Sequence, residues 1–365
     1  MDTSFEYIFP SIRGVQAGRE YYVSMCPLRL IPKIFLFDEE ELLPEVRAQR
    51  ILNHARIPEI TRYLLENREN YVFSALTASI DGSVRFRAVG EEGEANRVGA
   101  LHVDMESRFI INDGQHRRKA IEEALRQDPG LGHETIAVVF FLDRNLERCQ
   151  QMFADLNRYA VRPSRSLGLL YDHRNSMAQV AKLVAMKSET FKDVVELEKT
   201  TLSARSRKLF TLSAIYSACC ALLGTENPES KEEAGATCCE YWDEVGKHLP
   251  EWQFVRQSKM TAGEVRRDFV HSHSIVLQAL GVVGRHLLEV EKKTWKKRLQ
   301  PLGDLDWFRT NSRLWEGRAM TGGRMQKASH NVTLTANLLK QTVGLELTPE
   351  ERRAEDAFMR GEHAS

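Results

Sequence analysis

The string Asn-Asp-Gly-Gln-His-Arg-Arg, which begins at Asn112, holds the side chains of this chain that are best suited to chemistry. Residues 108–112 have the pattern of a β-strand and residues 115–126 that of a helix, so Gly114 falls at the bend between them. The start of a helix carries unpaired N–H groups and a partial positive charge. Together with the imidazole and guanidinium groups of the string, this turn is suited to holding a phosphate.

Asp113 lies at the mouth of this turn. A carboxylate there can hold a divalent metal or position a water molecule, so Asp113 is a candidate metal ligand and, with His116, a candidate catalytic residue. The candidate nucleotide or phosphate ligands of the turn are Gly114, Gln115, His116, Arg117 and Arg118. A second interpretation stays open, in which Asp113 caps the helix and a solvated basic turn follows it.

Two basic stretches follow in the second half of the chain. Arg162 and Arg165 flank Pro163 and can track a nucleic-acid backbone. Residues 292–298, Lys-Lys-Thr-Trp-Lys-Lys-Arg, combine cations with an aromatic ring and suit contacts to phosphates. A solvated helix end explains the same residues equally well. The candidate DNA-binding residues are Arg158, Arg162, Arg165, Lys292, Lys293, Lys296 and Lys297.

The charge of the chain is unevenly distributed. Residues 1–160 hold 20 Lys and Arg against 25 Asp and Glu, whereas residues 161–365 hold 31 against 26, so a net −5 precedes a net +5. The second half is therefore the one expected to present a basic face to DNA. Solvated helix faces would produce the same counts.

Histidine and cysteine patterns do not predict a metal site. His271 and His273 are two residues apart, which points them in different directions on a helix. We expect either satisfied core or surface positions or a place facing a cleft between domains. The adjacent pairs Cys219–Cys220 and Cys238–Cys239 lack the spacing of a zinc site. We therefore expect packed thiols, with neither zinc nor an iron–sulfur cluster.

The elements around these residues predict an α+β chain, with an α/β domain over residues 1–163 and an all-α domain over residues 164–365. Strand patterns cover residues 21–25, 33–37, 71–80, 84–88, 100–103, 108–112 and 136–142. Asp81–Gly82 predicts a hairpin between two of them, 71–80 and 84–88. Helical patterns cover residues 42–66, 115–126, 146–157, 166–173, 177–185, 211–223, 232–248, 265–291, 332–343 and 349–360.

Composition excludes several classes of protein. Of 365 residues, 42% are apolar and 28% charged, which is typical of globular domains and not of a fibre or a disordered tail. No run approaches the ~18 consecutive apolar residues of a membrane span. The N-terminal residues do not have the pattern of a secretory signal, so we expect a cytoplasmic protein without a membrane partner.

The string Asp-Gly-Gln-His-Arg resembles the motif of the DGQHR-domain proteins, and the wider chain resembles the DndB family of bacterial DNA phosphorothioation systems. Three further segments carry the resemblance: residues 14–37 with their Pro-Leu-Arg-Leu-Ile-Pro turn, residues 154–166, and residues 263–281 with Val-Arg-Arg-Asp-Phe-Val-His-Ser-His. The DGQHR unit is also similar to the ParB/sulfiredoxin-like superfamily. Gln115 stands where sulfiredoxin has its catalytic cysteine, which argues against a sulfiredoxin-type reductase.

The resemblance implies a ParB/sulfiredoxin-like N-terminal domain in which Arg117 binds a phosphate. It also implies that residues 155–158 return beside this turn, where Asp155 would bind Mg²⁺ with Asp113, and Asn157 and Arg158 would contact a nucleotide. A left-handed helix cap at Asn157 is the open alternative.

The function that the resemblance implies is a DNA-binding regulator, a repressor of the modification operon that tunes modification frequency. Double-stranded DNA and other phosphorothioation-system proteins are the implied partners, and a homo-oligomer is compatible with the sequence. The alternative is an enzyme, a Mg²⁺-dependent hydrolase of ATP or another nucleoside triphosphate, whose turnover gates DNA association. A third interpretation is an interaction scaffold.

Overall fold

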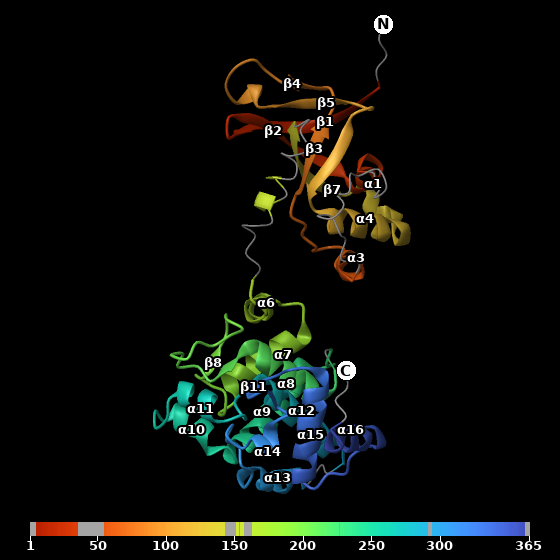
Figure 1. Ribbon diagram of the computed structural model, residues 1–365. Helices are drawn as coiled ribbons and strands as arrows, with labels where there is room; N and C mark the ends of the chain where they lie inside the picture. The colour runs from red at the N-terminus through yellow and green to blue at the C-terminus, as the bar shows by residue number, and fades with distance from the viewer. Residues whose placement is uncertain are drawn as a thin grey trace. The chain divides into compact units, whose positions relative to one another are not determined.

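The computed structural model describes residues 5–35, 55–142, 151–152, 154–156, 163–225, 227–290 and 294–361. Contacts between Cα atoms divide the chain into two compact units, residues 1–161 and 162–365 (Figure 1). Within the described residues, no helix is both long enough and apolar enough to cross a membrane.

A mixed seven-stranded sheet forms the centre of the first unit. Its strand order is β4-β5-β1-β2-β7-β3-β6, and every neighbouring pair is antiparallel except β3 and β7, which are parallel. The strands are β1 (Glu6–Gln16), β2 (Arg19–Pro27), β3 (Leu76–Asp81), β4 (Val84–Ala88), β5 (Val98–Asp104), β6 (Arg108–Asp113) and β7 (Thr135–Leu142). This sheet confirms a mixed α/β class for the chain.

The predicted hairpin between β3 and β4 is wrong. β4 pairs with β5, with Val84 opposite Val103, while β3 lies between β7 and β6. Burial explains the separation. Leu76, Ala78 and Ile80 of β3 are fully or almost fully buried, as an interior strand requires, whereas β4 has no buried residue and lies at the edge.

The helices α1 (Ile31–Ile34), α3 (Arg56–Glu66) and α4 (Gln115–Gln127) pack in this unit, with short 3₁₀ turns at Leu28–Leu30, Gly93–Asn96 and Pro129–His133. Ile121 of α4 and Leu64 of α3 belong to one apolar cluster with Phe140 of β7. The predicted strand at residues 33–37 is wrong where the structure describes it, because residues 33 and 34 belong to the helical turn α1, which has Pro32 near its start. Of the predicted helix over residues 42–66, α3 is described.

The second unit is mostly helical. Its helices are α6 (Arg165–Tyr171), α7 (Ser176–Lys187), α8 (Leu212–Leu223), α9 (Lys231–Lys247), α10 (Pro250–Arg256), α11 (Ala262–Asp268), α12 (Ser274–Val290), α13 (Trp295–Arg298), α14 (Ser312–Trp315), α15 (Ser329–Thr342) and α16 (Pro349–Met359), with a 3₁₀ turn at Gln300–Gly303. The prediction of a purely helical second half is wrong in one respect. Four two-residue strands, too short to leave a period in the sequence, form two pairs: β8 (Val195–Glu196) with β9 (Phe210–Thr211), and β10 (Met320–Thr321) with β11 (Arg324–Met325).

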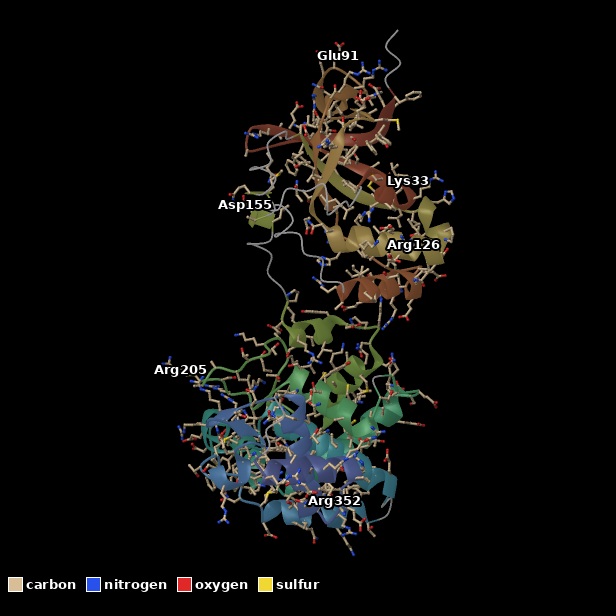
Figure 2. The ribbon with its side chains drawn as sticks, turned by 45° about the vertical axis from the view of Figure 1, so that its right-hand side comes forward. Lys33, Glu91, Arg126, Asp155, Arg205 and Arg352 are labelled. Atoms are coloured by element: carbon tan, nitrogen blue, oxygen red, sulfur yellow. The ribbon has the colours of Figure 1, made fainter. Side chains whose placement is uncertain are left out.

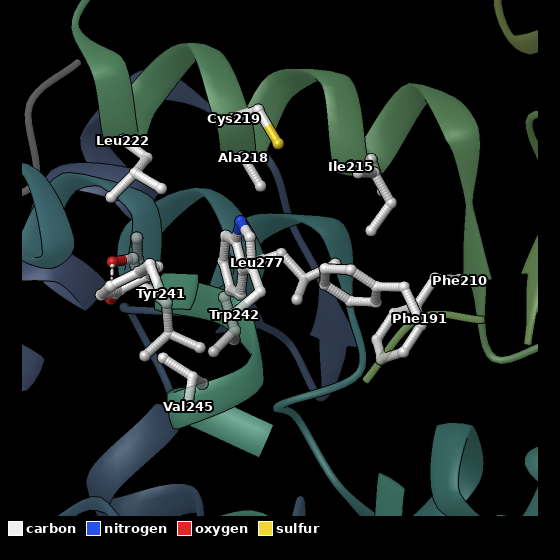
Figure 3. Packing of buried hydrophobic residues seen from close by; sticks show 14 of the residues in the cluster. Phe191, Phe210, Ile215, Ala218, Cys219, Leu222, Tyr241, Trp242, Val245 and Leu277 are labelled. Carbon is white, nitrogen blue, oxygen red and sulfur yellow. Dashed lines mark hydrogen bonds between the residues drawn. The ribbon is translucent and has the colours of Figure 1, made fainter. Parts of the chain in front are cut away.

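Aromatic and aliphatic side chains from α8, α9 and α12 form the core of this unit (Figure 3). Trp242 is fully buried below Cys219, and the Phe191 ring lies with its centroid 5.5 Å from that of Trp242. The hydroxyl of Tyr241 donates to the carbonyl of Leu280 at 2.6 Å, so this buried polar group is satisfied. Cys219 belongs to this core, and the Cys238 thiol and burial hold its pKa well above the ordinary value.

The predicted helix over residues 265–291 is wrong, because residues 269–273 interrupt it. There the backbone turns away to pair elsewhere: Phe269 bridges Phe308 in strand fashion, and the Val270 N–H donates to the Trp307 carbonyl at 2.9 Å. No glycine or proline marks the break. Tertiary hydrogen bonds therefore end α11 and start α12, and they are invisible to a local pattern.

Candidate functional site

A left-handed glycine makes the turn between β6 and α4. Gly114 has φ +105° and ψ 17°, and the first helical hydrogen bond runs from the Arg118 N–H to the Gly114 carbonyl at 2.9 Å. A Cβ atom at this position would lie 2.3 Å from Cδ2 of Leu76, so a side chain is excluded both by conformation and by space. The predicted strand–glycine–helix geometry is confirmed.

Arg117 reaches back from this helix to the start of β3. Its Nη2 donates to Asp113 Oδ2 at 2.6 Å and to the Ala75 carbonyl at 3.2 Å, and its Nη1 donates to Ser74 Oγ. The Arg117 side chain is 21% exposed and the Asp113 side chain 44% exposed. Asp113 also lies opposite Thr77 in the β3–β6 register, so strand pairing brings the two segments together.

Three buried polar atoms around Gly114 have no hydrogen-bond partner among the described residues. They are Asn112 Oδ1, Gln115 Nε2 and Arg117 Nε. The other end of the Asn112 amide is satisfied, since its Nδ2 donates to Ser79 Oγ at 2.7 Å. A buried polar atom without a partner costs about 1–3 kcal/mol. Two of the three atoms are donors, so an acceptor at this turn would recover that cost.

Arg118 points the opposite way, into the interior of the unit. It is 5% exposed, its Nε donates to the Phe35 carbonyl at 2.9 Å, and its Nη2 donates to the Pro32 carbonyl at 3.1 Å. Nη1 pairs with Glu122. Partial burial raises the pKa of Glu122, but Lys119, Arg118 and Arg126 outweigh it and hold that pKa below its ordinary value. These contacts tie α4 to α1 and favour a structural role for Arg118.

For the other predicted residues of this site, the structure describes fewer contacts or none. His116 is half-buried on the first turn of α4. Asp155 is exposed (Figure 2) and accepts a hydrogen bond from Gln151 Nε2 at 2.8 Å. Asn157 and Arg158 lie outside the described residues. In the described part of the chain, no three His, Cys, Asp or Glu side chains are placed to hold a metal.

Sequence reasoning missed Ser74 and Ala75, the partners of Arg117. They precede a strand that is distant along the chain, and nothing in their residue types indicates a site. The pairing of β3 with β6 is the signal that identifies them, because it places the segment before β3 beside Asp113. The pairing that the sequence suggested for β3, with β4, pointed elsewhere.

Of the seven predicted DNA contacts, the structure describes three. Arg165 begins α6, and its guanidinium carbon lies 5.6 Å from the ring centroid of Tyr216. Lys296 pairs with Glu240 at 2.6 Å, and this hydrogen bond raises the pKa of Lys296. Lys297 is exposed. Those outside the described residues are Arg158, Arg162, Lys292 and Lys293.

Trp295 is buried and lies against Tyr241, with ring centroids 5.8 Å apart. A ring in this position does not supply the aromatic surface that the sequence suggested beside the lysines of residues 292–298. The nearby Lys296 ammonium does lie 5.4 Å from the Trp295 ring centroid. This contact stabilises the helix end. Because the Trp295 ring is buried, it is not available to stack on a base.

His271 and His273 lie in the break between α11 and α12, each with its own partners. His271 is fully buried, accepts from Trp252 Nε1 at Nδ1 (2.9 Å) and lies 3.2 Å from Glu251 through Nε2. His273 Nε2 donates to the Arg266 carbonyl at 2.9 Å. Burial lowers the pKa of both, that of His273 to about 4. Core packing, one of the two expected environments, is what the structure describes for His271.

A family model described as DNA-sulfur modification-associated matches residues 9–346. The chain belongs to the DndB family. A search of curated proteins found no match, and a search of solved structures also found none.

The DndB match spans elements of both units. It begins within β1, includes the Gly114 turn and all of α12 and α15, and ends before α16. Membership therefore associates the chain as a whole, and not the DGQHR turn alone, with DNA sulfur modification.

Proposed function

We propose that this DndB-family chain is a DNA-binding regulatory component of a DNA sulfur modification system, and that the Gly114 turn binds the phosphate of a nucleotide. Its partners would be duplex DNA and other proteins of the system. The carrying observation is the pair of buried, unpartnered donors at the turn, Gln115 Nε2 and Arg117 Nε. A phosphate oxygen would supply the acceptor that these two atoms lack.

The backbone supports the same proposal. N–H groups of the residues before Arg118 precede the hydrogen-bond ladder of α4, at the positive end of a helix dipole. A ParB/sulfiredoxin-like turn would place a phosphate there as well. Within the turn, Arg117 is the proposed charged ligand, whereas the interior contacts of Arg118 remove it from that set.

Calorimetric titration with ATP, with and without Mg²⁺, tests the turn. Arg117→Ala should weaken binding roughly 10- to 100-fold, because a charge-assisted hydrogen bond contributes about 1.5–3 kcal/mol. Arg126→Ala is the matched control, since it removes an exposed guanidinium from the other end of the same helix. Equal affinity of the Arg117 variant and the wild type would reject Arg117 as a ligand.

Gln115→Met separates binding from folding. It removes the unpartnered buried donor at nearly constant shape, so stability should be unchanged or slightly higher while ATP binding weakens. A variant that loses stability and keeps full affinity would assign Gln115 to the fold alone.

Hydrolysis of a nucleoside triphosphate is the second candidate function, with Asp113 and His116 as its proposed catalytic residues. Asp113 is the observation in its favour, because its carboxylate is partly exposed directly beside the proposed phosphate position. Its pairing with Arg117 would have to yield to Mg²⁺, and Asp155 is the second proposed ligand. Phosphate release from ATP is the measurement. Release that requires Mg²⁺, and that Asp113→Asn abolishes without loss of nucleotide binding, would establish hydrolysis.

A further inference from the structure

A pocket of about 630 Å³ opens on the helical unit, outside the site described above. Three segments distant in the sequence contribute a cation each: Arg165 at the start of α6, Arg285 in α12, and Lys327 just before α15. None of the described residues that line it is Asp or Glu. A concave site with several cations and no lining carboxylate attracts anions.

The cations of this pocket are only partly compensated. Arg285 pairs with Glu289 at 3.1 Å, but that carboxylate is more than half exposed and does not line the pocket. The carboxyl end of α8 adds about half a negative charge. Desolvation and the charge of Arg165 both lower the pKa of Lys327, which indicates that these two cations lie close together. Net positive charge therefore remains.

Two further groups near the pocket do not change this balance. His286 Nδ1 hydrogen-bonds the Val282 carbonyl at 3.0 Å, so this nitrogen carries the proton, and Nε2 faces the ammonium of Lys340 at 3.3 Å. Both ring nitrogens of this lining residue are therefore engaged in contacts with the protein. Lys340 is itself fully buried and paired with Glu351 at 2.5 Å. The available charge is thus that of Arg165, Arg285 and Lys327.

The rest of the wall is part apolar and part uncharged polar, the latter supplied by Ser217, Thr225, Gln278 and His286. Tyr216, Cys220, Ala221 and Val282 line the apolar part, and the Tyr216 ring lies against the Arg165 guanidinium. Arg285 lies so close to the end of α8 that a Cβ on Gly224 would fall 2.4 Å from its Cζ. Gly224 also has φ +68°, so two features keep this position a glycine. The volume and mixed lining match those of small-molecule sites.

We propose that this pocket binds a small organic phosphate, with its phosphate among Arg165, Arg285 and Lys327 and its organic part against Tyr216, Cys220 and Val282. The site is separate from the Gly114 turn and does not depend on the function proposed for that turn. A DNA backbone would need the same cations but no apolar surface beside them, so we favour the small ligand.

Protection of Cys220 from alkylation, followed by mass spectrometry on the full chain, localises binding to this pocket. Cys220 is half-buried and lines it, whereas Cys239 is half-buried and does not. ATP, AMP and inorganic pyrophosphate are the probes. We expect ATP or AMP to slow modification of Cys220 at least threefold, while that of Cys239 is unchanged.

Charge variants complete the test. Lys327→Gln and Arg285→Gln should each raise the ATP or AMP concentration needed for protection about tenfold, and Arg285→Lys should restore most of it. Arg353→Gln, which removes an exposed cation of α16, is the control. Arg117→Ala should leave Cys220 protection intact, so a failure at the Gly114 turn is distinguishable from a failure here.

Three outcomes would overturn the proposal. The first is no protection by any probe at millimolar concentration. The second is protection by a DNA duplex only, which would make the pocket part of a DNA surface. The third is protection that both glutamine variants retain in full.

Discussion

Neighbouring arginines in one motif have opposite environments. Arg117 lies at the surface turn with one donor unpartnered, whereas Arg118 is buried and bonded to two backbone carbonyls and to Glu122. Their order follows from helix geometry, in which consecutive residues point about 100° apart. The sequence could show that both are basic, and strand and helix patterns could place the turn. Only the position of α1 shows which of the two faces inward.

Arg118→Ala should destabilise the first unit by about 2–4 kcal/mol, because it leaves two buried carbonyls without their donor and removes one of the three cations around Glu122. Hydrogen exchange measured by mass spectrometry in α4 and β6 should show the loss. All five tryptophans lie in the second unit, so their fluorescence is an internal control that should not change. Unaltered exchange in α4 would contradict the structural role.

His273 should make the second unit sensitive to acid. Its pKa is about 4 in the folded chain and near 6.5 when unfolded, so the unfolded state binds the proton more readily. Stability is therefore full above pH 6.5 and is lost as the pH falls toward 4, by about 3 kcal/mol for this residue. Urea denaturation followed by tryptophan fluorescence should show a shallower pH dependence in His273→Gln, which keeps a side-chain donor. Identical pH profiles would exclude His273 as the cause.

At the scale of elements, local sequence patterns predict where a strand or helix lies better than they predict which elements it pairs with. β6, α4 and β7 lie where the sequence predicts them, since alternation and helical spacing are local properties. The place of β3 in the sheet depends on which distant strands bury it, namely β7 and β6. A turn signal at Asp81–Gly82 is local and carries no information about those strands. The prediction of a continuous helix through residues 269–273 is wrong for the same reason. Backbone pairing with Trp307 and Phe308, which are distant in the sequence, interrupts that helix.

Gly114→Ala tests the turn as an element junction. We expect a loss of about 1–3 kcal/mol from backbone strain, increased by the clash with Leu76. Gly168→Ala is the matched control, because that glycine lies exposed in α6 with open space around it and should gain about 0.5–1 kcal/mol. Thermal unfolding followed by circular dichroism compares the two. A neutral Gly114 variant would mean that the turn adjusts without cost.

At the scale of the whole molecule, the charges separate by unit: the chain up to Val161 carries −5 and the remainder +5. DNA binding through the second unit should weaken steeply with salt, with a log–log slope near −0.9 for each phosphate neutralised. Arg165→Ala and Arg162→Ala should each flatten the slope by about one, for all sequences alike. Lys296→Ala should have a smaller effect, because Glu240 already pairs with it.

Mobility shifts at several salt concentrations measure these slopes. Lys33→Ala, which removes an exposed cation of the acidic unit, is the control and should leave the slope as in the wild type. Equal slopes for all variants would remove residues 162 and 165 from the DNA surface.

The position of β7 also governs when the first unit can fold during synthesis. β7 is the last strand of the sheet along the chain, yet it lies between β2 and β3, and so joins the strands β4-β5-β1-β2 to the pair β3-β6. A nascent chain that stops before Thr135 has two partial sheets with open edges and no strand to connect them. The ribosome must therefore release Leu142 before the Gly114 turn acquires its final support, and until then those edges are exposed to chaperones and to other chains.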